Sequence, residues 1–122
     1  MVNTNPGSDT AARTLITELR ALLGTKLVAY LAESHDTATV RGWVDGTSPL
    51  PDQAILTRLQ VALDAARRIS ARDTPTVAQT WFQGRNPALD NQPPAQLLRE
   101  ANLDTVRDTI RDAATGFTTH GT

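Results

Sequence analysis

The stretch that decides the fold is TWFQGRNPALDNQPPAQLL, Thr80 to Leu98. It contains the adjacent pair Trp81-Phe82 in a chain whose aromatic content is only 4%, and it contains three of the seven prolines. Proline removes a backbone donor and pushes the residue before it out of the α region, so this stretch is not one helix or one strand. We expect a helix end, a loop of fixed course, and a new helix that begins at Pro94, where proline suits the first turn.

The apolar side chains of this stretch need cover. Trp81, Phe82 and Leu89 all lie near the predicted loop, and an aromatic side chain has about 150–250 Å² of surface to bury. We therefore expect the loop to be packed. The cover comes either from the rest of this chain or from another chain, and the sequence leaves both alternatives open for Trp81.

Apolar residues at three-to-four spacing continue on both sides of the stretch and predict helices. The expected helices cover 9–23, 25–32, 37–45, 52–70, a segment that begins at Pro75 and carries Trp81, 94–100 and 103–117. Ser8 or Asp9, Thr25 and Asp36 are the expected caps of the first three, and Gly24 and Gly46 are expected to end the first and third. No run alternates with a period of two for long enough to form a strand. The sequence predicts an all-α fold of about seven helices.

The expected organisation has three parts: a disordered tail over residues 1–8, a helix-turn-helix region over 9–72, and a partner-binding region with a C-terminal tail over 73–122. Twelve basic residues balance thirteen acidic ones among 122, which excludes a strongly cationic protein. The absence of cysteine excludes disulfide scaffolds and thiolate metal sites. No apolar run has the length of a membrane span, and the polar start lacks the pattern of a signal peptide. We expect a soluble cytoplasmic protein with no membrane contact.

Two short helices separated by a brief break, as predicted over 25–46, are the pattern of a helix-turn-helix. The second helix would present Thr37, Thr39 and Arg41 to DNA, as hydroxyls and a guanidinium that can contact bases or phosphates. The region also carries Glu33, Asp36 and Asp45, which is a poor electrostatic footprint for DNA. A helical hairpin that binds no DNA therefore stays an equal alternative.

The last predicted helix carries Val106, Ile110 and Phe117 on one face. We expect Val106 and Ile110 to complete the chain's own core, and Phe117, which follows Gly116 and precedes a polar tail, to be better placed for a partner. Arg107 and Arg111 alternate with three aspartates, Asp104, Asp108 and Asp112. This pattern is most often a solvated face, and contact with a partner's cleft is the alternative.

The sequence offers little for catalysis. The only histidines, His35 and His120, fall in a predicted turn and in the tail, with no nucleophile or metal-ligand spacing beside them. No phosphate-binding loop is present. We expect a protein that is not an enzyme and uses no cofactor.

The second half of the chain resembles the toxin-binding domain of the Xre/MbcA/ParS antitoxin family. The resemblance is carried by Trp81-Phe82, Asn86-Pro87, Leu89, Pro94, Leu97-Leu98, Val106, Ile110 and Gly116, in the family's order W-F, N-P-x-L, P-x-x-L-L and a final helix that ends near glycine. Residues 25–46 look like the Xre-type helix-turn-helix that precedes this domain. The resemblance covers roughly residues 10–117.

The resemblance implies an antitoxin of a type II toxin-antitoxin system that binds and neutralises a RES-domain toxin, an NAD-depleting enzyme. It also implies repression of the chain's own operon by binding to operator DNA, and we expect a homodimer. The expected toxin-binding residues are Trp81, Phe82, Asn86, Leu89, Arg107, Arg111 and Phe117. The alternatives are a stand-alone Xre-type transcriptional regulator whose C-terminal half dimerises, and a phage or plasmid accessory protein with a different partner.

Overall fold

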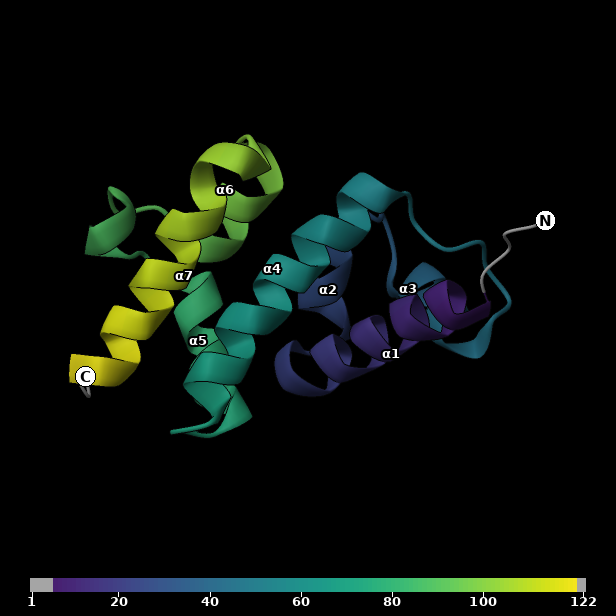
Figure 1. Ribbon diagram of the computed structural model, residues 1–122, viewed down its shortest axis with the longest axis horizontal. Helices are drawn as coiled ribbons and strands as arrows, with labels where there is room; N and C mark the ends of the chain where they lie inside the picture. Colours follow the sequence, from purple (N-terminus) through teal and green to yellow (C-terminus); the bar gives the residue numbers. More distant parts are fainter. Residues whose placement is uncertain (1–5, 121–122) are drawn as a thin grey trace.

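The computed structural model describes residues 6–120. Within this range, segments that carry apolar residues at helical spacing fold into helices, and several of these helices begin or end at a glycine or a proline. The elements are α1 (Pro6–Leu23), α2 (Thr25–Leu31), α3 (Thr37–Asp45), α4 (Gln53–Ser70), α5 (Pro75–Gln83), the 3-10 turn η1 (Pro87–Leu89), α6 (Pro94–Glu100) and α7 (Leu103–His120). Within this range no strand is present beyond one isolated bridge between Asn86 and Gln92. The prediction of an all-α fold with about seven helices is confirmed (Figure 1).

Most of the predicted helix boundaries follow from local chemistry. The Asp36 carboxylate accepts a hydrogen bond from the Thr39 N–H at 2.9 Å and caps α3, as predicted. Gly24 and Gly46 have φ values of 91° and 83°, a region that glycine enters without steric cost, and they end α1 and α3. Pro94 begins α6.

Two predicted helix starts are wrong. α1 begins at Pro6 and not after Ser8 or Asp9, so Pro6–Ser8 belong to the helix and not to a disordered tail. Residues 1–5 of the predicted tail lie outside the described residues. Thr25 is the first residue of α2 and not its cap, because Gly24 takes the capping position and no side chain accepts a bond there. Proline fits the first turn of a helix, which explains the earlier start of α1.

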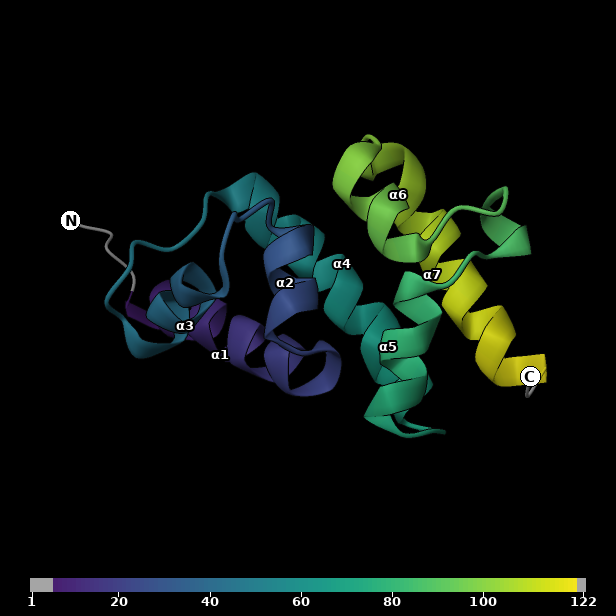
Figure 2. The same ribbon diagram turned by 180° about the vertical axis from the view of Figure 1, so that it is seen from behind.

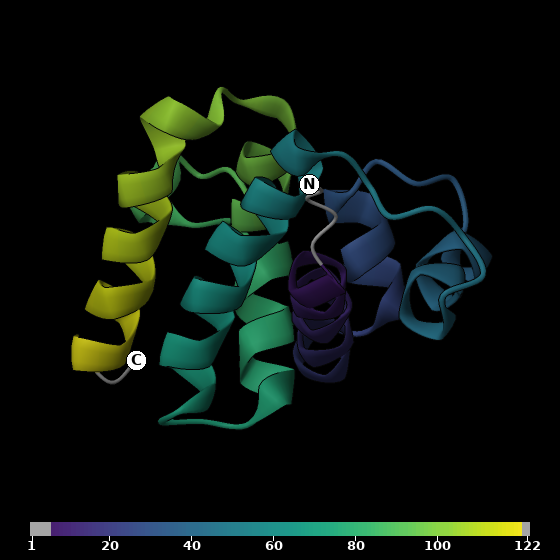
Figure 3. The same cartoon turned by 45° about the vertical axis from the view of Figure 1, so that its right-hand side comes forward.

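Helix α4 lies at the centre of the molecule. α1, α2 and α3 lie on one side of it and α5, α6 and α7 on the other (Figure 1), and α4 makes its most extensive contacts with α7 and α1. α7 runs beside α4 in the same direction (Figure 3). The buried side chains form one continuous cluster from α1 to α7. The expected boundary between residues 72 and 73 therefore divides sequence regions and does not divide two cores.

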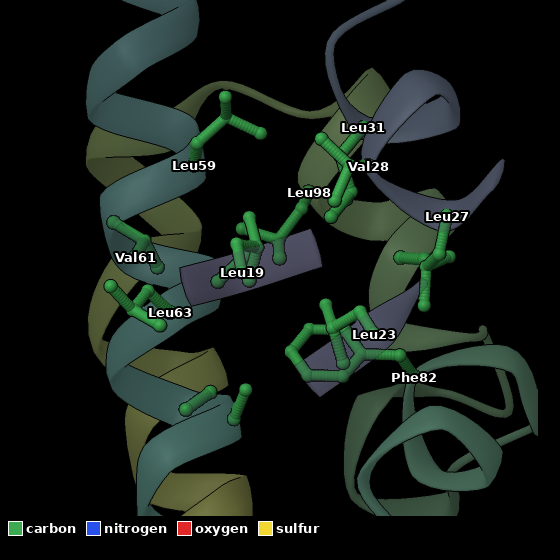
Figure 4. Close-up of a cluster of buried hydrophobic side chains, with 14 of the residues drawn as sticks. Leu19, Leu23, Leu27, Val28, Leu31, Leu59, Val61, Leu63, Phe82 and Leu98 are labelled. Carbon is green, nitrogen blue, oxygen red and sulfur yellow. The ribbon is translucent and has the colours of Figure 1, made fainter. Parts of the chain in front are cut away.

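The core is built mainly from aliphatic side chains, together with the aromatic rings of Trp43, Trp81 and Phe82. Figure 4 shows leucines and valines of α1, α2, α4 and α6 that converge with Phe82 of α5. The fully buried large side chains include Phe82, Ile16, Leu19, Leu31, Leu59, Leu63, Ile69, Leu98 and Ile110. Each such side chain stabilises the fold by about 1.5–3 kcal/mol relative to an exposed position. None of the helices between residues 6 and 120 combines the length and apolarity required of a membrane span.

An ion pair joins α1 to α4 at the surface. The Arg67 guanidinium donates from Nε to Oε2 of Glu18 at 2.7 Å and makes a second contact to the other carboxylate oxygen. The hydrogen bond from Arg67 holds the pKa of Glu18 below its ordinary value. Both side chains are more than a third exposed, so the pair stabilises the fold by only about 0.2–1 kcal/mol.

Stability is therefore expected to fall at acidic pH. A depressed folded-state pKa stabilises the fold above the carboxyl's unfolded pKa, and this contribution is lost as pH falls through the folded value. The pKa of Asp36 is also lowered, by its hydrogen bonds from Thr39.

Urea unfolding between about pH 6 and about pH 3 measures the effect. Glu18→Gln is expected to reduce the pH dependence, whereas Glu100→Gln, at an exposed carboxylate outside the ion pairs of the described residues, is not. Equal pH profiles for wild type and Glu18→Gln would contradict the assignment.

Candidate functional site

The loop between α5 and α6 has a fixed course. The Asn86 side chain accepts a hydrogen bond from the Ala88 N–H at 2.9 Å and begins η1. Asp90 and Asn91 follow with φ values of 58° and 62°, which turn the chain back so that Gln92 bridges to Asn86. Asparagine and aspartate tolerate this left-handed conformation better than other side-chain-bearing residues. The prediction of a packed loop of defined course agrees with this geometry.

Three of the predicted toxin-binding residues share one surface pocket. Trp81 of α5, Asn86 of the loop and Phe117 of α7 line a solvent-open pocket of about 470 Å³. The other lining residues are Arg85, Pro87, Ala88, Asp112, Ala113 and Gly116. We call this the α5–α7 pocket. Its walls come from segments about 30 residues apart in sequence that α4 holds together, since α4 contacts both α5 and α7.

Both side chains of the Trp81-Phe82 pair are buried, but only Trp81 lines the α5–α7 pocket. The two rings meet edge to face, with centroids 5.1 Å apart and planes at 86°. Phe82 is fully buried, whereas Trp81 keeps 8% of its surface exposed at the pocket wall. Leu89 is also buried, with 5% exposed. Phe82 and Leu89 are thus covered by the core in the free chain, and their role in contacting a toxin stays a prediction.

Phe117 lies inside α7, within the helix predicted over 103–117. The helix continues three residues beyond the predicted end, to His120. Phe117 is half-buried and packs partly against the core. Val106 and Ile110 are buried, which confirms the expectation that they complete the chain's own core. A Cβ atom at Gly116 would meet no atom within 4 Å, so this glycine borders open space at the pocket.

Arg107 and Arg111 lie apart from the α5–α7 pocket. They line a different groove, between α7 and α4, together with Asp64 and neighbouring α4 residues. Arg111 also pairs with Asp108 at 3.2 Å and approaches Asp112 at 3.7 Å. Both arginines are exposed. The structure therefore does not group them with Trp81, Asn86 and Phe117, although Asp112 reaches the pocket from the same helix.

The predicted DNA-contacting residues lie on α3. Arg41 is exposed, and Thr37 and Thr39 are half-buried. The Thr39 hydroxyl donates to the Asp36 carboxylate at 2.9 Å, in addition to the capping bond from its backbone N–H. These two bonds lower the pKa of Asp36, so its negative charge persists at the end of α3 that would meet DNA. This charge opposes phosphate contact.

Arg58, which was not among the predicted site residues, fixes the turn between α2 and α3. Arg58 of α4 donates from Nη1 to the Leu31 carbonyl at 2.7 Å and to the Glu33 carboxylate at 2.8 Å. Glu33 has φ of 58°, an uncommon value for a residue with a side chain. Arg58 therefore holds a strained turn against α4. The only feature of the sequence that indicates this contact is the presence of an arginine within the amphipathic pattern of α4.

The described residues contain no group of three or more metal-ligating side chains. His35 is exposed in the turn before α3, and the side chain of His120 lies outside the described part of the chain.

Comparisons with protein-family models, curated proteins and solved structures gave no match to this chain. Functional interpretation therefore depends on its own motifs and surfaces. The α5–α7 pocket is the surface on which residues selected from the sequence converge.

Proposed function

We propose that this chain is the antitoxin of a type II toxin-antitoxin system and that it binds and neutralises a RES-domain toxin, which depletes cellular NAD. The observation that supports the proposal is the α5–α7 pocket. Trp81, Asn86 and Phe117 were selected by their resemblance to a toxin-binding motif or by their place in the sequence, and they line one open surface. Motif and geometry thus favour the same contact region.

The chemistry of this pocket suits a protein partner. Its apolar walls come from Trp81 and Phe117, and its rim carries the exposed charges of Arg85 and Asp112. Large aromatic side chains surrounded by polar residues are typical of the centres of protein interfaces, where burial on binding supplies most of the affinity.

The surface is also held in place before binding. Val106, Ile110 and Ala114 anchor α7 in the core, and the Asn86 side chain fixes the first turn of the loop. A surface that is ordered in advance loses less conformational entropy on association. The antitoxin would act by occupying the toxin surface and would supply no chemical group to a reaction.

Co-expression with the neighbouring gene product tests this proposal. If that gene encodes a RES-domain toxin, its induction alone is expected to stop growth, and co-expression of this chain is expected to restore growth. The two proteins are expected to co-purify at a fixed ratio. The control is the same induction with an empty plasmid. Continued growth arrest together with a soluble, folded chain that does not co-purify would contradict the proposal.

Operator binding, by an antitoxin or by a stand-alone regulator that dimerises through its C-terminal half, is the second candidate. The observation that favours it is the α2–α3 pair, which packs together and leaves Arg41 exposed while Val40 and Trp43 are buried. This is the division of faces that a recognition helix needs. The carboxylates of Asp36 and Asp45 on the same helix weigh against tight non-specific binding.

Binding to the upstream DNA across a salt series tests the second candidate. If Arg41 reads a base, Arg41→Ala is expected to weaken specific binding by about 1–3 kcal/mol. Arg68→Ala, at an exposed arginine of α4, is the matched control and is expected to have little effect on sequence preference. Affinity should fall steeply as salt rises. The absence of a shifted band at low salt would exclude operator binding by this chain.

A further inference from the structure

A second pocket lies at the junction of α2, α5 and α6, separate from the α5–α7 pocket. It has a volume of about 290 Å³ and is open to solvent on one side. Figure 2 shows α2 on one side of α4 and α5 and α6 on the other, and α6 contacts both α2 and α5. Phe82 lines this pocket, whereas Trp81 lines the other. The two adjacent aromatic residues thus line two different pockets.

The floor and one wall of this α2–α6 pocket are apolar and fixed. Phe82 and Leu27 belong to the core, with 0% and 6% of their surfaces exposed. Tyr30 forms a half-buried wall, and the Arg99 guanidinium carbon lies 4.6 Å from the centre of its ring. This cation–π contact holds the tyrosine ring in position. The pocket can therefore receive an apolar group without rearranging the core.

The one charge among the residues that line this pocket is positive, and the nearby Glu100 carboxylate accepts a hydrogen bond from the lining residue Gln96 at 3.3 Å. Lys26 is the pocket's only charged lining residue and is the single lysine of the chain. Its side chain is exposed and forms no ion pair within the described residues. Arg99 adds a second positive charge against the Tyr30 ring. No acidic residue lines the pocket, so its electrostatics favour an occupant that carries a carboxylate next to an apolar group.

Size and rim chemistry favour a peptide over a free small molecule. Pockets for drug-sized ligands hold about 300–1,000 Å³, and this one is at the lower limit, which suits one bulky side chain. Gln83 lies at the pocket and carries an amide group that both donates and accepts hydrogen bonds. The Gln96 amide nitrogen donates to the Glu100 carboxylate at 3.3 Å, which leaves its oxygen as an acceptor. These groups match the backbone N–H and C=O of an extended segment.

We propose that the α2–α6 pocket docks a short acidic peptide segment of a partner protein. A bulky apolar side chain of the segment enters the pocket over Phe82, and a neighbouring carboxylate pairs with Lys26. This contact is independent of the toxin-binding proposal, because it uses another surface and a different set of charges.

Because the chain has a single lysine, a lysine-specific label can report on this pocket. Reductive methylation with ¹³C-formaldehyde labels only Lys26 and the chain's terminal amine, so one side-chain NMR signal reports on the pocket rim. The probe is the blocked peptide acetyl-Glu-Phe-Glu-amide, and acetyl-Lys-Phe-Lys-amide and acetyl-Glu-Ala-Glu-amide are the matched controls. The acidic aromatic peptide is expected to shift the Lys26 methyl signal and the backbone amides of Tyr30 and Gln96 in a saturable manner, and each control peptide is expected to bind more weakly.

Charge reversal separates the pocket from general surface charge. Lys26→Glu is expected to weaken binding of the acidic peptide by about fivefold or more, as measured by the Tyr30 and Gln96 amide shifts. Arg68→Glu, an equal charge change on exposed α4, is expected to leave it unaltered. Circular dichroism of both variants verifies that they are folded.

Three results would overturn the proposal. The first is the absence of saturable shifts at Lys26, Tyr30 and Gln96 with the acidic peptide. The second is equal binding of the acidic and basic peptides. The third is binding of phenylacetate as tight as that of the peptide, which would make this a site for small carboxylates and not for a peptide segment.

Discussion

Phe82→Ala is expected to lower the free energy of unfolding by about 3–5 kcal/mol, the loss that removal of a fully buried aromatic ring produces. The Phe82 side chain has no exposed surface and lies among leucines of α1, α2 and α6 (Figure 4). Its removal leaves a cavity at the point where both halves of the chain meet, and the surrounding helices cannot close it fully. Because small domains are stable by only about 5–15 kcal/mol, the variant is expected to be close to unfolding.

Urea or thermal unfolding followed by circular dichroism measures this loss. Thr80→Ala, at an exposed position of the same helix, is the control and is expected to change stability by less than about 0.5 kcal/mol. A loss below about 1 kcal/mol in Phe82→Ala would show that the ring is not part of the core.

Phe117→Ala is expected to have the second large effect, on partner binding. An aromatic side chain at the centre of an interface contributes about 2 kcal/mol or more, which is roughly a thirtyfold change in dissociation constant. Because Phe117 is only half-buried in the free chain, its truncation is expected to cost the fold about 1 kcal/mol. Binding is therefore expected to suffer more than stability does.

Calorimetric titration of the purified toxin with each variant measures the affinity. Thr115→Ala is the matched control, because Thr115 is exposed on the same helix and does not line the α5–α7 pocket. Trp81→Ala is less informative, since Trp81 packs edge to face on Phe82 and its loss would affect both core and surface. Unchanged affinity in Phe117→Ala would remove the pocket from the interface.

The parts of the fold that were predicted correctly depend on neighbours in sequence. Asp36 caps α3 through a residue three positions later, and Gly24 and Gly46 end helices through their own backbone conformation. Pro94 begins α6 for an equally local reason. The helical spacing of apolar residues in α7 identified Val106 and Ile110, which are buried there. Local features of this kind can be predicted without a structure.

The arrangements that the sequence did not predict depend mainly on contacts between distant segments, whereas the misplaced starts of α1 and α2 are local. The sequence alone does not reveal that Phe82 faces α1, α2 and α6 while Trp81 faces α7, because both residues belong to one helix and have similar hydrophobicity. Arg107 and Arg111 were grouped with the aromatic residues, but the rotation of α7 on α4 turns them to another groove. Arg58 reaches a turn 25 residues away. These arrangements follow from how the helices pack and not from any single helix.

The cellular NAD level after induction of the proposed partner, a RES-domain toxin encoded by the neighbouring gene, tests the central claim most directly. Co-expression of the wild-type chain or of Thr115→Ala is expected to keep NAD near its level before induction, whereas Phe117→Ala at equal protein abundance is expected to let NAD fall. Loss of NAD to the same extent with and without the wild-type chain would contradict the antitoxin function. Full protection by Phe117→Ala would instead contradict the assignment of the α5–α7 pocket as the surface that neutralises the toxin.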